Sequence, residues 1–191
     1  IGLLYMSFTR LIYLLLIFVV AWCGYYLLTP KGNDAIQVAP DSELPMFSGT
    51  GLENITYGED GVRSYIIRST NLDHYAKSGD TIFNNPTLMV YREGSVIEWK
   101  VTATRAVLDE DQVLTLYDKV LMQNLLPGAS FDTMATDKLV INLTNRDFKA
   151  DQQVMLVGPQ FETTGGAMQG NLKQHTATLT DEVQGRYETV T

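Results

Sequence analysis

The feature that most constrains this chain is an uncharged run near its N-terminus. Residues Leu11 to Leu28 read LIYLLLIFVVAWCGYYLL and lie between Arg10 and Lys31. At about 1.5 Å of rise per residue, a helix of this length matches a hydrocarbon layer of roughly 30 Å. A helix in a soluble core would be shorter and apolar on one face only. We therefore expect one transmembrane helix over residues 11–30.

A cleaved signal peptide is the alternative interpretation of this run. The apolar core of such a peptide spans about 7–15 residues, which is shorter than this run, and TPKGN after it has no A-x-A cleavage pattern. Lipoprotein processing at Cys23 is disfavoured because bulky Trp22 precedes it. A retained anchor is favoured, with Cys23 as one of its apolar residues.

Charge predicts the topology of the chain and limits its ligands. Arg10 marks the short N-terminal end, so residues 1–10 are expected in the cytoplasm and the remainder is expected to be exported. All 22 acidic residues and 12 of the 14 basic ones follow residue 31, which gives that part a formal charge of −10. No Lys/Arg cluster interrupts this balance, so nucleic acid is not an expected partner. An anionic ligand would have to be bound mainly through its apolar part.

Beyond the anchor, the pattern changes twice. Residues 31–50 are rich in Gly, Asp, Ser and Pro and predict an extended linker. Residues 51–191 alternate Val-, Ile-, Thr-, Tyr- and Phe-rich runs with polar residues, broken by the turns GED, KSGD, REGS, DEDQ and TNRD. Sustained helical spacing does not recur after Leu28. The second region therefore predicts an antiparallel all-β domain and argues against a parallel βαβ architecture.

The β region also repeats itself. At an offset of 34 residues, Ala103-Thr104 aligns with Ser69-Thr70, and at an offset of 32 it aligns with Ala135-Thr136. Such a period is typical of stacked hairpin layers that are each too small to bury an apolar face alone. Coincidence among alternating sequences is the other explanation.

Motifs for catalysis or metal binding do not emerge from the sequence. His74 and His175 are the only histidines and lack the spacing of a zinc site. There is no GxSxG nucleophile motif, GTG at 49–51 does not open a helix after a strand, and the carboxylates of DEDQ fall in an expected turn. We expect no catalytic residue, no metal ligand and no cofactor, and an anchored hydrolase is disfavoured.

The alternation predicts which side chains face inward, since one parity of an antiparallel strand faces one side of the sheet. The inward apolar residues are expected to be Ile55, Tyr65, Ile67, Phe83, Leu88, Val90, Ile97, Trp99, Val101, Ala103, Leu114, Leu116, Leu139, Ile141, Leu143, Met168 and Ala177. In most β-domains such residues fill a closed core. A lining for bound lipid is the functional alternative.

Several segments together resemble the LptC family of lipopolysaccharide transport proteins. They are YGEDGVRSYII, IFNNPTLMVYREG, WKVTATRAVL and VMLVGPQFETTGGAMQGNL, in this order behind one anchor. The resemblance spans nearly the whole chain. It implies a twisted, boat-like antiparallel β-jellyroll in the periplasm of a Gram-negative bacterium, attached to the inner membrane.

The resemblance also implies a function without enzymatic activity. A family member receives lipopolysaccharide from the ABC transporter formed by LptB, LptF and LptG and passes it to LptA, with the acyl chains in the interior of the jellyroll. Its helix lies between helices of LptF and LptG and modulates the ATPase. The alternative is a membrane-attached scaffold that docks partners without binding lipid.

Four positions have further expected roles. Ala21 and Gly24 are small residues on one helix face, which allows close helix contact, although small residues also occur there by chance. Gly61 and Gly158 are expected to require positive φ or close backbone approach, with Gly158 near the C-terminal edge that pairs with LptA in the family. The alternative is a loop glycine that tolerates replacement. Asp118 departs from the glycine usual in the family's LxLxGxV run.

Overall fold

The computed structural model describes residues 8–28, 44–129 and 131–187, in two compact units that divide after Ser42. In the first unit, helix α1 spans Phe8–Leu28, so it begins three residues before the expected range. Residues 29 and 30 lie outside the described residues. Among the helices of the described ranges, none combines the length and hydropathy required to cross a membrane.

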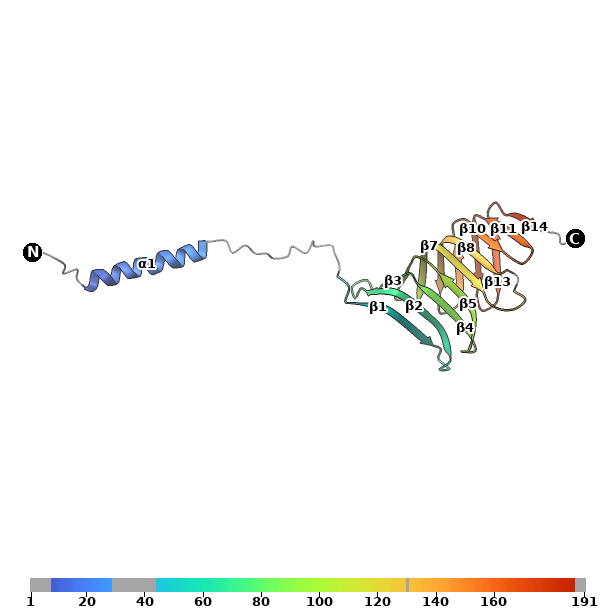
Figure 1. The fold of residues 1–191 in the computed structure, drawn as a ribbon, viewed down its shortest axis with the longest axis horizontal. Coiled ribbons are helices and arrows are strands. Elements are labelled where there is room, and N and C mark those ends of the chain that lie inside the picture. The colour runs from blue at the N-terminus through green and yellow to red at the C-terminus, as the bar shows by residue number, and fades with distance from the viewer. Residues whose placement is uncertain (1–7, 29–43, 130, 188–191) are drawn as a thin grey trace, which may run out of the picture. The chain divides into compact units, whose positions relative to one another are not determined.

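The second unit is an all-β domain, as the alternation predicts, and its strands are antiparallel. Figure 1 shows them progressing from β1 and β2 at one end of the domain to β14 at the other. The strands are β1 (Phe47–Tyr57), β2 (Arg63–His74), β3 (Thr81–Asn84), β4 (Thr87–Arg92), β5 (Val96–Thr102), β6 (Arg105–Leu108), β7 (Val113–Asn124), β8 (Thr133–Asn142), β9 (Asp147–Ala150), β10 (Val154–Val157), β11 (Phe161–Gly165), β12 (Ala167–Asn171), β13 (Thr176–Thr180) and β14 (Gln184–Tyr187).

The β-domain begins earlier than the sequence suggests. Phe47 to Thr50 were expected in the linker over 31–50, yet they pair with residues 71–74 of β2. The expected boundary at residue 51 is therefore wrong. The polar, Gly-containing stretch FSGTG has no clear alternation, and its backbone is fixed by the partner strand rather than by its own pattern.

The sheet folds into two leaves. Leaf 1 contains β4, β5, β10, β11 and β14 with residues 63–68 of β2, 120–124 of β7 and 133–136 of β8. Leaf 2 contains β3, β6, β9, β12 and β13 with residues 71–74 of β2, 113–117 of β7 and 138–142 of β8. Strand β1 pairs along β2 in both leaves. The long strands therefore pass from one leaf to the other.

We call the positions where the chain passes from one leaf to the other corners. Backbone hydrogen bonds join successive corners. The Asn85 amide donates to the Thr104 carbonyl at 2.8 Å, and the Thr104 amide donates to the Asp118 carbonyl at 3.0 Å. Farther along, the Gly166 amide donates to the Asp181 carbonyl at 2.6 Å. These bonds satisfy main-chain groups where the strand ladders are interrupted.

The corners explain the sequence repeat. Ser69-Thr70 lies at the corner of β2, Ala103-Thr104 separates β5 from β6, and Ala135-Thr136 ends the leaf-1 part of β8. The matching residues therefore lie at or next to the corners of successive layers, which agrees with the predicted stacking of hairpin layers.

Asp118 lies at the corner of β7, in the bulge between Tyr117 and Val120. Its φ is 62°, and that of Lys119 is 52°. This left-handed conformation is most accessible to glycine, and Asp tolerates it better than most other residues. The departure from glycine at this position therefore preserves the bulge at some cost in backbone strain.

We predict that Asp118→Val lowers the free energy of unfolding by about 1–2 kcal/mol, because a β-branched residue fits left-handed backbone poorly. Asp118→Gly should have a much smaller effect. Urea unfolding followed by circular dichroism measures both changes.

Asp137→Val is the matched control, since Asp137 is exposed on the facing strand and has no positive φ. It should leave stability nearly unchanged. Equal losses for Asp118→Val and Asp137→Val would contradict the account of the corner.

Candidate functional site

The interior between the leaves gathers most of the side chains that the alternation predicts to face inward. Thirteen of the seventeen residues expected to face inward expose 4 % or less of their surface. They are Tyr65, Ile67, Phe83, Leu88, Val90, Trp99, Val101, Leu114, Leu116, Leu139, Ile141, Leu143 and Met168. In this structure the interior is a packed apolar core.

Two predicted inward residues face the other way. Ile55 is opposite Ile66 in the β1–β2 ladder, whereas the inward Ile67 is opposite Asn54, so Ile55 is on the outer face and 38 % exposed. Ile97 pairs with Tyr91 beyond a bulge that follows Val90, which reverses its direction. The predictions for Ile55 and Ile97 are therefore wrong, because a one-residue change in register exchanges the two faces.

Ala103 and Ala177 lie at the margin of the interior. Ala103 is half-buried at a corner and packs against the core. Ala177 is exposed on the edge strand β13, opposite Gly170, and lines a cavity at the end of the interior.

Sequence reasoning missed several residues that are buried in the same core. The set includes Leu72, Ala106, Val120, Met122, Phe131, Met134, Phe148, Ala150, Val154 and Leu172. Met122 and Met134 face each other across β7 and β8. Met122 has the same parity as Leu114 and Leu116, so alternation along β7 could have found it. Met134 and Leu139 differ in parity because β8 turns its corner between them. Phe131 and Leu172 lie in connections, where alternation gives no signal.

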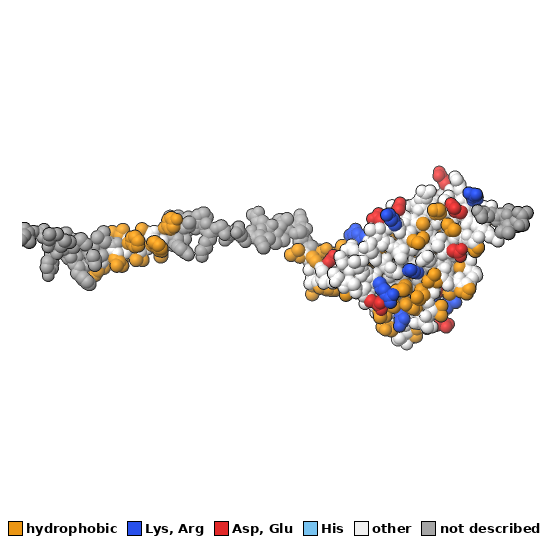
Figure 2. Space-filling view, viewed as in Figure 1, with side chains coloured by type: hydrophobic (Ala, Val, Ile, Leu, Met, Phe, Trp, Pro, Cys, Tyr) orange, Lys and Arg blue, Asp and Glu red, His pale blue; other side chains and the backbone are white. Residues whose placement is uncertain are grey.

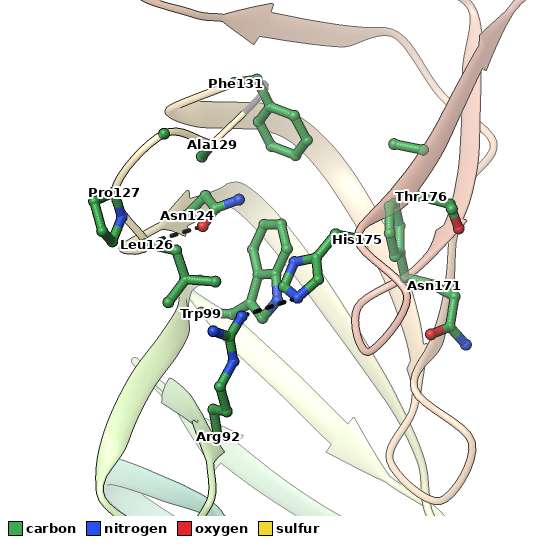
Figure 3. A pocket seen from close by; sticks show the side chains of 13 residues that line it. Arg92, Trp99, Asn124, Leu126, Pro127, Ala129, Phe131, Asn171, His175 and Thr176 are labelled. Atoms are coloured by element: carbon green, nitrogen blue, oxygen red, sulfur yellow. Dashed lines mark hydrogen bonds between the residues drawn. The ribbon is translucent and has the colours of Figure 1, made fainter.

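One cavity opens between the leaves at the end of this core. It has a volume of about 180 Å³ and is lined by Trp99, Phe131, Phe148, Leu126, Ala177 and neighbouring residues. Figure 3 shows Arg92 and His175 meeting beside the Trp99 ring, with their nitrogen atoms 3.2 Å apart. The cavity is smaller than the roughly 300–1,000 Å³ of typical ligand sites, so a lipid chain requires the leaves to separate.

The free ends of the leaves, at the strand termini away from the corners, are joined by polar side chains. Tyr65 Oη of leaf 1 donates to Gln112 Oε1 of leaf 2 at 3.1 Å. Arg146 Nη2 donates to the Ser64 carbonyl at 3.2 Å and to Ser64 Oγ at 2.8 Å. We call Gln112, Arg146 and His175 the closing residues. Each is the last residue of a four-residue connection within leaf 2.

The closing residues share a conformation as well as a position. Their φ angles are 61°, 70° and 54° in chain order, and Gly79 has φ 73° in the first connection of the same leaf. Non-glycine residues are uncommon in this region and strained there. Three repeats thus place a long polar side chain on left-handed backbone, and each of these side chains reaches leaf 1.

Glu98 is the centre of the third contact. Its side chain is only 8 % exposed, Arg92 Nη2 donates to Glu98 Oε1 at 2.8 Å, and His175 Nε2 lies 2.7 Å from the same oxygen. Nearby, Trp99 Nε1 donates to the Leu172 carbonyl at 3.2 Å. A buried carboxylate needs such partners, because desolvation without them is costly. His175, which lacks the spacing of a zinc ligand, contacts this carboxylate instead.

The two glycines behave differently. Gly61 has φ 72° in the β1–β2 turn, so the expected positive φ is confirmed. Gly158 does not have positive φ, but a Cβ atom there would overlap the ring of Phe161. The expected close approach is thus to an aromatic side chain. The Gly158 amide also donates to the Phe161 carbonyl at 2.9 Å.

The helix residues and the surface add little to the site. Ala21 is exposed on α1, whereas the side-chain position of Gly24 lies outside the described residues. On the face shown in Figure 2, basic side chains are scattered singly among acidic ones on the β-domain. Among the described residues, no group of three or more His, Cys, Asp or Glu side chains could hold a metal ion.

Comparison with known proteins identifies the family. The family model described as "LptC: Lipopolysaccharide-assembly, LptC-related" matches residues 13–188. The chain belongs to the LptC family. It is 28 % identical to the lipopolysaccharide export system protein LptC of Haemophilus influenzae, over 89 % of this chain and 91 % of that protein. Identity to the Escherichia coli K12 protein of the same name is also 28 %, over 82 % of each chain.

A solved structure supports the fold. The crystal structure of LptH from Pseudomonas aeruginosa, described as the LptA-homologous periplasmic component of the lipopolysaccharide transport device, superposes with a TM-score of 0.53. It covers 65 % of this chain and 95 % of LptH at 8 % identity. At that identity the likeness concerns architecture alone.

We predict that Gly158→Ala lowers the free energy of unfolding by about 1–3 kcal/mol, because Phe161 must leave its place against the core. Thermal or urea unfolding of the purified protein measures the loss.

Gly185→Ala provides the control on β14. A Cβ atom there would meet its nearest neighbour, Thr163 Oγ1, at an ordinary 3.4 Å. The interpretation of Gly158 fails if the two alanine variants are equally stable.

Proposed function

We propose that this chain is a membrane-attached, periplasmic lipopolysaccharide-binding relay protein. It accepts lipopolysaccharide from the LptB, LptF and LptG transporter and passes it to LptA. Membership of the LptC family supports a role in lipopolysaccharide transport, and the likeness to LptH supports an architecture shared along the route. A transport family is also consistent with a protein that is not an enzyme.

One observation carries the proposal, namely an apolar interior enclosed by a sheet folded on itself. The corners join the leaves through the main chain, whereas the free ends are joined by a few side-chain contacts. The leaves can therefore part at their free ends while the strands stay paired. Acyl chains entering between them would gain roughly 0.8 kcal/mol per buried CH₂ group, so apolar burial alone would supply binding affinity.

The scaffold hypothesis also has one observation in its favour. The core residues are packed to between 0 and 8 % exposure, so the interior is closed without lipid. A protein that only docks partners would stay closed. The two hypotheses differ in whether lipid ever contacts the interior.

Membrane attachment is part of the proposal and rests on the sequence. The run Leu11–Leu28 is uncharged, and the described apolar side chains of α1, including Leu15, Phe18 and Trp22, are at least 45 % exposed. Buried apolar surface in a bilayer would stabilise such a helix. We place residues 1–10 in the cytoplasm and the β-domain in the periplasm, at the inner membrane.

Partner contacts would use the ends of the sheet. Strand β14 pairs only with β11, and β13 only with β12, among the described strands. Their free backbone groups suit strand addition by LptA at the C-terminal edge, where Gly158 and Phe161 lie. In α1, Ala21 and Gly24 would contact helices of LptF and LptG and thereby modulate the ATPase.

A photoreactive amino acid at Phe83 or Trp99 should capture lipopolysaccharide in living cells, because both side chains lie between the leaves. Immunoblotting with antibody against lipopolysaccharide detects the adduct.

Leu121 is the matched control, an apolar residue 37 % exposed on the outer face between two buried neighbours. It should give no adduct. Absence of an adduct at every inward position would favour the scaffold hypothesis. Equal capture at Leu121 would show that the adducts report contact with lipid in general.

Deletion of residues 1–30 should alter the ATPase rate of the reconstituted transporter while the β-domain still binds lipopolysaccharide. Within the full chain, Ala21→Leu with Gly24→Leu should have the same effect, because it blocks close helix contact.

Val20→Leu with Cys23→Leu is the control for this pair, with the same spacing one position earlier on α1. It should leave the rate unchanged. An unaltered rate after the deletion would limit the helix to a tether.

A further inference from the structure

A second cleft adjoins the apolar cavity at the free ends of the leaves. It has a volume of about 420 Å³ and shares Arg92 and His175 with the cavity lined by Trp99. Its lining adds Arg146 and Lys173, with Glu93 and Glu98 as the acidic members. Polar and apolar sites are thus adjacent, which suits an amphiphile.

The basic residues of this cleft come from separate parts of the chain. Arg92 ends β4, Arg146 ends the β8–β9 connection, and Lys173 and His175 belong to the β12–β13 connection. In a chain of net charge −8, the convergence of Arg92, Arg146 and Lys173 contrasts with the scattered positions of cations elsewhere. The fold therefore creates a local positive site that the linear sequence conceals.

Glu98 neutralises only part of this charge. Its carboxylate is engaged by Arg92 and His175. Within the described residues, neither Arg146 nor Lys173 has a carboxylate at ion-pair distance. These two cations remain available to an anion in the cleft.

Arg146 is the less hydrated of the two. It is half-buried, and the only acceptors of its guanidinium among the described residues are the two oxygen atoms of Ser64. Burial lowers the pKa of Arg146, while the Glu98 carboxylate and Tyr65 act in the opposite direction. A guanidinium has five N–H donors in a planar fork that matches phosphate oxygens, so most of its capacity is unused.

We propose that this cleft binds the phosphate group of an amphiphile whose acyl chains occupy the adjacent interior. Arg146 and Lys173 contact the phosphate, and Arg92 and His175 engage Glu98. The inference rests on the proposed lipid-binding function and adds the part of the ligand that the cleft recognises. It adds a polar contact to the expectation that an anionic ligand is bound mainly through its apolar part.

The test compares two lipids on the purified full chain in detergent. One is monophosphorylated lipid A, and the other is the same lipid without its phosphate. Wild type should prefer the phosphorylated lipid. Lys173→Gln should weaken that binding by up to about tenfold, the equivalent of one charge-assisted hydrogen bond, and leave the other lipid unaffected. Arg146→Gln also removes a contact between the leaves, so it should lower the affinity for the phosphorylated lipid more than the affinity for the other lipid.

Lys149→Gln is the control, since it removes one exposed cation from β9 outside the cleft. It should change neither affinity. Lys173 is exposed and makes no side-chain hydrogen bond within the described residues, so its substitution does not endanger folding. Equal weakening for both lipids, or for the Lys149 variant as well, would overturn the phosphate site.

The remaining outcomes separate the two proposals. If wild type binds both lipids equally, the relay function stands and the phosphate site is rejected. If it binds neither, the proposed function itself fails. Inorganic phosphate alone should bind far more weakly than the phosphorylated lipid. Comparable, Arg146-dependent binding of inorganic phosphate would assign the cleft to free phosphate and reject the amphiphile.

Discussion

Main-chain hydrogen bonding at the corners is the constraint on which this structure depends. Each layer of the β-domain must turn from leaf 1 into leaf 2 without leaving buried amide or carbonyl groups unpaired. Left-handed residues such as Asn85, Asp118 and Asp181 make the turn, and bonds such as that from Thr104 to Asp118 link successive layers. The corners fix the line along which the sheet folds. The apolar faces of the two leaves therefore pack against each other and form the core.

The free ends are built on a different principle. There the leaves meet through side chains, and three of them project from left-handed backbone at one repeated position. Net stabilisation from a single hydrogen bond is only about 0.5–1.5 kcal/mol, so a few such contacts hold the free ends together weakly. Strong corners and weaker free ends together give a sheet that can open along one side. That asymmetry is what a lipid relay requires.

Much of the fold is legible in the sequence, and the failures have physical causes. Alternation predicts the all-β domain and most of the interior, because apolar and polar residues alternate along a strand that buries one face. It fails at Ile55 and Ile97, where cross-strand register decides the face. The boundary at residue 51 is missed because β1 takes its conformation from β2. Asp118 is singled out by its departure from the family pattern, but its φ belongs to the folded chain.

The polar part of the site could not have been predicted from sequence. Glu98, Arg146 and His175 lie far apart in the chain, and no motif links them. Their proximity depends on how leaf 2 connections reach the end of leaf 1, which is a property of the whole folded sheet. The small-residue pair of α1 and the identity of the partners, by contrast, are inferences from sequence and family alone.

The central claim is that the leaves part at their free ends to admit lipid while the corners stay fixed. Distances between spin labels measure this directly, in a Cys23→Ser background. One pair of labels replaces Ser95 and Gln174, across the free ends, and another replaces Thr70 and Lys119, along the corners. With lipopolysaccharide bound, the first distance should increase and the second should not. Lipid binding without any change in the first distance would contradict the account.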